Sequence, residues 1–286
     1  VLLLFAAGLL CIIKGGDLFV DAASWIAEAS GIPKFIIGAT VVSFATTMPE
    51  MLVSVFAALQ GNADIAVGNA VGSVTANVGL IMCVALICME CAMTRKQFGV
   101  KACLLLAAIL ALFGFTRDGQ LSVLESVLIL VIFVGFLVES LIAARQEQGS
   151  ELPAQEERPK IDKKTVLLNI GKFLLGAAGI VLGAQLLIDN GSALARMLGV
   201  PDAVIAATMI AIGTSLPELV TTLTAIKKKQ ASLSVGNIIG ANIMDLTLIM
   251  PLCAVIQGKP MTVERQGMLL DIPACLIICA AALIPA

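Results

Sequence analysis

The sequence contains no histidine, no tyrosine and a single tryptophan, and only 13% of its 286 residues are charged. Because histidine is the commonest zinc ligand and a common general base, its absence argues against zinc hydrolases and most acid–base enzymes. No basic cluster is interleaved with aromatic residues, as a nucleic-acid surface would require. The composition therefore favours neither an enzyme nor a nucleic-acid-binding protein.

Apolar side chains are abundant instead, at 59% of residues, and the mean hydropathy is +1.03. A soluble domain could not cover its surface with polar groups at this composition, so the surrounding solvent must be lipid. The apolar segments are continuous runs without period-two alternation, which predicts helices and excludes a barrel. We therefore expect an all-α, polytopic membrane protein.

A bilayer core about 30 Å thick needs roughly 20 residues per helical crossing, and the apolar runs accommodate about nine spans. The expected spans are 1–27, 35–60, 65–89, 98–115, 121–144, 163–189, 203–226, 233–256 and 266–284. A polar segment, 145–164, is interpreted as a cytoplasmic linker between a first half, 1–144, and a second half, 165–286. The chain starts inside an apolar run without an initiating methionine, so we expect its natural beginning to be missing.

Many residues recur at a constant offset of 168 positions, which indicates an internal duplication. The segment 46–50, TTMPE, matches 214–218, TSLPE, and the segment 68–72, GNAVG, matches 236–240, GNIIG. Five spans precede the linker, so the second half must enter the membrane in the opposite orientation, as an inverted five-plus-five repeat. The offset also places a tenth span near position 289, so we expect one helix to be missing from the chain.

Lysine and arginine predict the orientation of the spans. If the first span begins outside, Arg95, Lys96, the linker and the lysines at 227–229 all face the cytoplasm. The glycines of the two GNxxG segments stand four apart, a spacing that lets another helix approach closely. This spacing alone does not separate a packing role from a functional one.

Four polar side chains fall about midway along expected spans: Glu50, Asn77, Glu218 and Asp245. An acid at that depth costs at least about 2.5–3.5 kcal/mol, so three acids require a compensating partner. No lysine or arginine lies at matching depth in the same spans. A bound cation is the simplest partner.

The neighbouring residues suit a cation. A hydroxyl side chain stands one helical turn before each of three of these positions, on the same helix face; the pairs are Thr46 with Glu50, Thr214 with Glu218 and Ser73 with Asn77. Pro49 and Pro217 lack an N–H and should free or tilt the carbonyls near Ala45–Thr46 and Gly213–Thr214. Carboxylates, hydroxyls and carbonyls form the all-oxygen shell that Ca²⁺ prefers, with six to eight ligands.

On these motifs the chain resembles the cation/calcium exchanger superfamily, in particular its prokaryotic sodium/calcium exchangers. Segments 38–50 and 211–218 are similar to the family's Thr-Ser-x-Pro-Glu signature, with Thr47 in place of serine, and the likeness covers nearly the whole chain. The resemblance implies a secondary active antiporter that exchanges Ca²⁺ for Na⁺ by alternating access in a prokaryotic inner membrane. Ca²⁺ and Na⁺ would be the transported ions, and no cofactor or obligate protein partner is expected.

The resemblance also implies roles for single residues. Glu50 and Glu218, with the carbonyls of Thr46 and Thr214, would coordinate Ca²⁺. The same glutamates would line sodium sites together with further residues, namely Thr47, Ser215, Ser73 and the carbonyls near Ser43 and Ala211.

Asn77 and Asp245 match the family's flanking central positions. Potassium-dependent relatives usually have aspartate at the place of Asn77, so its amide argues for potassium independence. Two positions depart from the pattern, since Ala241 replaces the usual serine and Val74 the usual asparagine. The absent hydroxyl at Ala241 takes away one expected sodium ligand, unless water or a carbonyl substitutes.

Charge balance adds a further expectation. With Glu50, Glu218 and Asp245 ionised, one Ca²⁺ would leave one negative charge, so we predict that Asp245 is protonated when calcium is bound. The alternatives are a proton/calcium antiporter of the same superfamily, a cation channel or an intramembrane enzyme. A proton-coupled antiporter would follow a pH gradient and ignore sodium, and a channel would exceed alternating-access rates.

Overall fold

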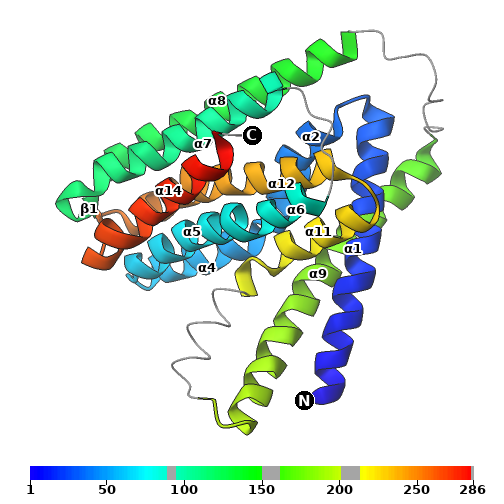
Figure 1. The fold of residues 1–286 in the computed structure, drawn as a ribbon, viewed down its shortest axis with the longest axis horizontal. Helices are drawn as coiled ribbons and strands as arrows, with labels where there is room; N and C mark the ends of the chain where they lie inside the picture. Colours follow the sequence, from blue (N-terminus) through cyan, green and yellow to red (C-terminus); the bar gives the residue numbers. More distant parts are fainter. Residues whose placement is uncertain (89–94, 150–161, 201–212, 285–286) are drawn as a thin grey trace.

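The computed structural model describes residues 1–88, 95–149, 162–200 and 213–284, and these are almost entirely helical (Figure 1). The first half contains α1 (Leu2–Ser30), α2 (Lys34–Ile37), α3 (Ser43–Thr46), α4 (Met48–Leu59), α5 (Ala63–Ala76), α6 (Cys83–Cys88), α7 (Arg95–Phe115) and α8 (Val123–Gly149). The second half contains α9 (Lys163–Met197), α11 (Leu216–Lys227), α12 (Ala231–Met244), α13 (Met250–Gln257) and α14 (Ile272–Leu283).

Short irregular elements join several of these helices. Four are π-helical turns: η1 (Gly38–Val42), η2 (Asn77–Met82), η4 (Asp245–Ile249) and η5 (Gly267–Asp271). A 3₁₀ turn, η3 (Thr116–Asp118), precedes the strand β1 (Gln120–Leu121), which pairs antiparallel with β2 (Met261–Thr262). π turns inside α-helices occur frequently at functional sites, and η2 and η4 begin at Asn77 and Asp245.

Within the described residues, six helical stretches are long and apolar enough to cross a membrane: Leu2–Ser30, Ala63–Cys88, Phe98–Asp118, Val123–Gln146, Lys163–Met197 and Ala231–Gln257. A bent pair, Lys34–Thr46 with Met48–Leu59, forms a seventh candidate with a 46° break. The predicted span 203–226 lies partly outside the described residues. The span predicted at 266–284 is helical over Gly267–Leu283 but is shorter than the other candidates. The polytopic all-α prediction is confirmed.

Residues separated by 168 positions adopt the same local structure in the two halves. Gly31 and Gly199 both have left-handed backbones, with φ of 67° and 81°. At the next turn of each half, Gly61 has φ of 79° and its counterpart Lys229 has φ of 55°. The duplication in sequence is therefore also a duplication of backbone conformation.

The long helices α1 and α9, which are counterparts in the two halves, pack against each other as an antiparallel pair (Figure 1). A Cβ added to Gly8 would lie 3.0 Å from the Gly183 carbonyl oxygen, and one added to Gly15 would lie 2.9 Å from that of Gly176. Gly176 is the counterpart of Gly8, and Gly183 is the counterpart of Gly15. Exchanging the halves therefore maps this interface onto itself, which is the geometry of an inverted repeat.

The second GNxxG segment packs directly against the first half. A Cβ added to Gly236 would lie 2.2 Å from the Phe35 carbonyl oxygen, and one added to Gly240 would lie 2.1 Å from that of Ala39. These glycines thus let α12 contact the backbone of α2 and η1, as their spacing predicts. On the other side of the molecule, α7 and α8 run beside one another, and the remaining helices lie between them and the α1–α9 pair (Figure 1).

Candidate functional site

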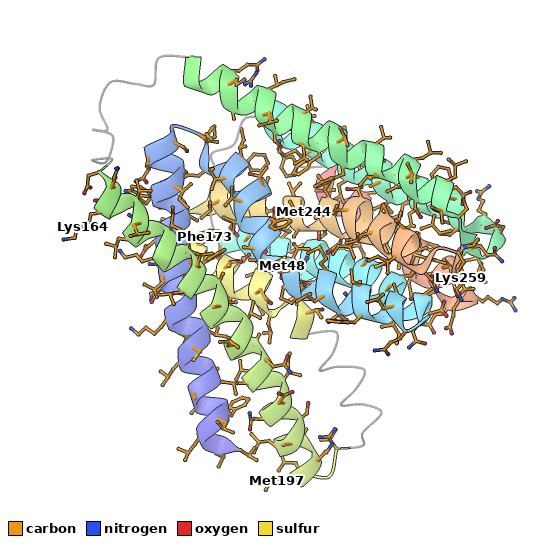
Figure 2. The ribbon with its side chains drawn as sticks, turned by 180° about the vertical axis from the view of Figure 1, so that it is seen from behind. Met48, Lys164, Phe173, Met197, Met244 and Lys259 are labelled. Atoms are coloured by element: carbon orange, nitrogen blue, oxygen red, sulfur yellow. The ribbon has the colours of Figure 1, made fainter. Side chains whose placement is uncertain are left out.

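The four mid-span polar residues are all buried in the bundle. Glu50 is 1% exposed, and Asn77, Glu218 and Asp245 are 0% exposed. They come from α4, η2, α11 and η4, so both halves contribute two of them. Figure 2 shows Met48, beside the α3–α4 break, and Met244, which precedes Asp245, in the central part of the molecule, away from both ends of α9.

The hydroxyl residues predicted for the site are buried as well. Their exposed fractions are at most 9%, and they are Ser43, Thr46, Thr47, Ser73, Thr214 and Ser215. The predicted carbonyl ligand near Ala211 lies outside the described residues. Every other predicted site residue therefore lies in the interior, although burial alone does not assign a ligand.

The carboxyl groups of the three acids have no hydrogen-bond partner. Both carboxylate oxygens of Glu50, Glu218 and Asp245 are buried and unpaired, and so are Thr47 Oγ1 and Asn77 Oδ1. Buried polar atoms are normally satisfied, because an unpaired buried charge costs several kcal/mol. Six unpaired carboxylate oxygens in one protein interior call for a positively charged occupant.

The acids lie within electrostatic range of each other across the two halves. Glu218 and Asp245 both act on the carboxyl group of Glu50. The Thr46 hydroxyl of the first half lies beside the carboxyl of Glu218, and the Ser73 hydroxyl lies beside that of Asp245. Neither hydroxyl makes a hydrogen bond of ordinary geometry to these carboxylates. Hydroxyls of one half thus stand next to acids of the other.

The proline motifs produce the same break in both halves. Thr47 has φ −79° and ψ −4°, and its counterpart Ser215 has φ −86° and ψ 3°. The first main-chain bonds beyond the two breaks also match, from Met51 to the Thr47 carbonyl at 3.0 Å and from Leu219 to the Ser215 carbonyl at 3.1 Å. In the described first half, no main-chain bond crosses the break to the carbonyls of Ala45 or Thr46. The free carbonyls predicted from Pro49 are confirmed.

Asn77 connects the two copies of the second motif. Its Nδ2 donates to Ser73 Oγ at 3.3 Å and to Asn242 Oδ1 at 3.0 Å, while Ser73 Oγ lies 3.4 Å from Ser215 Oγ. Asn242 was not among the predicted site residues, although its side chain is fully buried and its Nδ2 is unpaired. Asn242 is the counterpart of Val74 in the repeat, and this asparagine at the counterpart position is the sequence signal that could have identified it.

A buried lysine lies elsewhere in the bundle. Lys101 of α7 is fully buried and forms an ion pair with Glu139 of α8, and its Nζ lies 5.6 Å and 5.7 Å from the ring centres of Phe35 and Phe136. This pair is not among the features predicted from the sequence. Its charge is satisfied away from the central acids, and no ion pair joins a described lysine or arginine to Glu50, Glu218 or Asp245.

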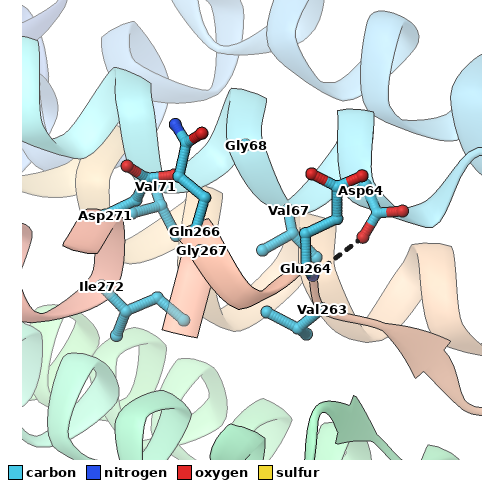
Figure 3. Close-up of a pocket in the computed structure, with 10 residues that line it drawn as sticks. All are labelled: Asp64, Val67, Gly68, Val71, Val263, Glu264, Gln266, Gly267, Asp271 and Ile272. Carbon is cyan, nitrogen blue, oxygen red and sulfur yellow. Dashed lines mark hydrogen bonds between the residues drawn. The ribbon is translucent and has the colours of Figure 1, made fainter. Parts of the chain in front are cut away.

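Among the described residues, acidic and cysteine side chains do not form a metal site by themselves. Within the part of the chain that is described, no three such side chains are placed to hold a metal ion together. The three central carboxyl groups are therefore not placed to hold one ion by themselves, and a cation at the centre would also need hydroxyl, amide or main-chain oxygens as ligands. A separate acidic pocket of about 100 Å³ contains Asp64, Glu264 and Asp271, where the Glu264 N–H donates to Asp64 Oδ1 at 3.1 Å (Figure 3).

The profile of the sodium/calcium exchanger protein family matches residues 1–142 and 168–285, which is most of the chain. The chain belongs to the sodium/calcium exchanger family. This is a family of membrane transporters and not of enzymes, so this exchanger is a multi-pass integral membrane protein that moves cations. The two matched segments flank the predicted linker.

Relatives of this exchanger include proteins of bacteria and archaea that match most of the chain. It is 34% identical over 257 residues to the inner membrane protein YrbG of Escherichia coli, covering 88% of this chain and 79% of the relative. It is 29% identical over 312 residues to the sodium/calcium exchanger MaX1 of Methanosarcina acetivorans, covering 96% and 88% of the two chains. A solved structure of the sodium–calcium exchanger NCX_Mj, soaked with Na⁺ and Sr²⁺, superposes with a TM-score of 0.80 at 27% identity, covering 98% of this chain and 89% of that one.

Proposed function

We propose that this exchanger moves Ca²⁺ in one direction and Na⁺ in the other, with Glu50, Glu218 and Asp245 as the charged centre of one shared site. The observation that carries the proposal is the set of six buried carboxylate oxygens without a hydrogen-bond partner or a basic neighbour. Ca²⁺ takes six to eight oxygen ligands, and carboxylates, hydroxyls and main-chain carbonyls are the oxygens gathered here. Na⁺ is also bound by oxygen, so both ions can use the same groups.

We assign Glu50 and Glu218, with the carbonyls of Thr46 and Thr214, to calcium. The free carbonyl at the first break and the matched backbone at both breaks support this assignment. The sodium sites add Thr47, Ser215, Ser73 and the carbonyls near Ser43 and Ala211. Asn77 and Asp245 flank the centre. The unpaired Thr47 Oγ1 and Asn77 Oδ1 support their inclusion.

Exchange follows from competition for these carboxylates. Several Na⁺ ions and one Ca²⁺ draw on the same negative charges and cannot bind together. Either cargo neutralises the site, whereas an empty site keeps uncompensated charge in a dehydrated interior, which costs several kcal/mol. Crossing between the two openings is therefore expected mainly for the loaded protein.

The test is ⁴⁵Ca²⁺ uptake into proteoliposomes, with sodium, potassium and proton gradients imposed one at a time. A sodium gradient is expected to drive uptake in the absence of the other two, and a potassium gradient is expected to add nothing. Liposomes containing the Glu50→Gln variant serve as the matched control. Uptake that follows the pH gradient and ignores sodium would replace this proposal with proton/calcium antiport.

A further inference from the structure

Asn237, from the second GNxxG segment, links the two halves beside the site. Thr46 Oγ1 of the first half donates to Asn237 Oδ1 at 3.1 Å, with the Ser43 carbonyl of its own half as a second acceptor at 3.2 Å, and Asn237 Nδ2 donates to Thr221 Oγ1 at 3.0 Å. Asn237 is 1% exposed, and Thr221 in turn donates to the Glu218 carbonyl at 2.9 Å. One carboxamide therefore joins the break of the first half to the glutamate segment of the second.

The counterpart of this link is not formed. Exchanging the halves turns the Thr46–Asn237 pair into Thr214 and Asn69, and although the structure describes both residues, no hydrogen bond joins them. Asn69 Nδ2 instead donates within its own half, to the Glu50 carbonyl at 3.3 Å and to Ser54 Oγ at 3.0 Å. Thr214 lines a cavity of about 230 Å³.

The cavity lies between α9 and the two proline breaks. Its walls include Ala184, Gln185 and Ile188 of α9, together with Pro49 and Pro217. This face of α9 is thus separated from the glutamate segments by open space.

The corresponding face of α1 is closed. Gly16, the counterpart of Ala184, is so close to α11 that an added Cβ would lie 2.6 Å from Thr224 Oγ1. Val20, the counterpart of Ile188, is 1% exposed. Just beyond, Lys228 Nζ lies 2.6 Å from Asp21 Oδ1 and 3.6 Å from Asp17 Oδ1.

The closed side is the cytoplasmic side, because it contains the run of lysines at 227–229. In an inverted repeat, the two halves exchange roles when access to the central site changes from one side to the other. The contacts on the closed side should therefore form in the other half when the opposite side closes. The Thr46–Asn237 bond belongs to this set.

We propose that Asn237 and Asn69 are positioning residues that act in alternation. The Asn237–Thr46 bond holds the cytoplasmic side closed, and the equivalent Asn69–Thr214 bond forms as it breaks and holds the outer side closed. The inference rests on the proposed exchange by alternating access. It gives Thr46 and Thr214 a second role. Their carbonyls are assigned to calcium, and their hydroxyls make the bonds that hold each side closed.

The bonds that Asn69 makes within its own half use its Nδ2, whereas the bond proposed with Thr214 uses its Oδ1 as the acceptor, so the two are compatible. The bond between halves is the contact that the proposal assigns to one state only. Removing Asn237 should therefore favour the inward-open state, and removing Asn69 should favour the outward-open state. Variants that only impaired folding or cation binding would not shift the equilibrium between the two open states in opposite directions.

The experiment compares two reporter cysteines at counterpart positions, Val20→Cys and Ile188→Cys. Each is placed in a background in which the eight native cysteines are replaced, and the rate of alkylation by a small maleimide is measured in detergent. The ratio of the rate at 188 to the rate at 20 reports which side is open. Asn237→Ala is expected to lower this ratio by up to about fivefold, the effect of one net hydrogen bond, and Asn69→Ala to raise it by a similar factor.

Thr46→Val removes the same bond from its other end with little change in shape. It should lower the ratio as Asn237→Ala does, and the double variant should add little to either single one. Ser234→Ala is the matched control, because the Ser234–Thr222 bond of 3.1 Å joins the same helices, α12 and α11, within one half. That variant should leave the ratio unchanged.

An unchanged ratio in Asn237→Ala and Thr46→Val, or a shift in the same direction for both asparagine variants, overturns the proposal. Alkylation is measured in a buffer that contains NaCl, so that the loaded protein can cross between the two openings, and it requires no transport of Ca²⁺, so this failure is distinct from a failure of the proposed exchange. Opposite shifts in a protein that does not transport calcium would reject the cargo and retain the alternating pair.

Discussion

The two halves place equivalent glutamates at the centre, but the residues around these glutamates differ between the halves. Glu50 and Glu218 follow the same broken backbone, with nearly equal dihedral angles at Thr47 and Ser215. The second motif differs at several counterpart positions, and at three of them the first half has Ser73, Val74 and Asn77 where the second has Ala241, Asn242 and Asp245.

These differences complement each other. The Ser73 hydroxyl lies beside the Asp245 carboxyl, and Asn77 donates to Asn242 across the halves. The duplication thus preserves the backbone that presents carbonyls and glutamates. The sequence differences between the halves set the number of charges and hydrogen-bond donors at the centre, because Asp245 is an acid and its counterpart Asn77 is not.

The largest effect is expected from the matched pair. Glu50→Gln and Glu218→Gln each remove one of three negative charges from a buried cation site while keeping the size of the side chain. Breaking a buried charge pair costs about 3–5 kcal/mol, so calcium exchange should fall by at least about 100-fold in both variants.

Initial rates of sodium-driven ⁴⁵Ca²⁺ uptake test this, with protein amounts equalised after reconstitution. Glu28→Gln is the control, since this glutamate pairs with Lys34 outside the site and both side chains are partly exposed. Normal exchange by Glu50→Gln would remove the assignment of the site.

Asp245→Asn makes the two central positions alike. If Asp245 is protonated when calcium is bound, the amide mimics that state, and calcium exchange should persist. In the parent, raising the pH ionises Asp245 and leaves the calcium-loaded site with one negative charge, so exchange should decline. The variant should lack this decline. Calcium affinity and transport that stay constant over the acid range in parent and variant alike would contradict the prediction that Asp245 is protonated when calcium is bound.

Ala241→Ser gives the second half the hydroxyl that the counterpart residue, Ser73, supplies in the first half. A single hydrogen bond or ligand contact of this kind contributes about 1 kcal/mol, so the sodium concentration for half-maximal exchange should fall about three- to fivefold. Ser73→Ala should raise it by a similar factor. Calcium exchange titrated with sodium at fixed calcium measures both. Equal sodium dependence in all three proteins would remove these two positions from the sodium sites.

The matched part of the site is also what could be predicted from the sequence. The constant offset, the proline–glutamate pairs and the acids in apolar runs can be recognised in the sequence without coordinates. The cost of placing an acid in a membrane span likewise follows from the residue type and its position. The pairing of Asn77 with Asn242 and that of Lys101 with Glu139 could not be predicted, because each joins residues of separate helices. The closure on the side that contains Asp21 and Lys228 could not be predicted either, because the repeat permits both closures and only the three-dimensional arrangement shows which one is formed.

The smallest effect is expected at a turn away from the proposed cation site, where the two counterpart residues share a left-handed backbone but differ in side chain. Lys229 has φ 55° and its counterpart Gly61 has φ 79°, and a left-handed conformation costs a residue with a Cβ about 1–2 kcal/mol. Lys229 is exposed, so Lys229→Gly should stabilise the folded protein by about 1 kcal/mol, offset partly by greater freedom of the unfolded chain. Gly61→Ala, which imposes the same strain on the first half, should destabilise it by a similar amount. Thermal unfolding in detergent measures both, and calcium exchange should be unchanged. A loss of stability in Lys229→Gly would show that the lysine side chain contributes more at this turn than its backbone strain costs.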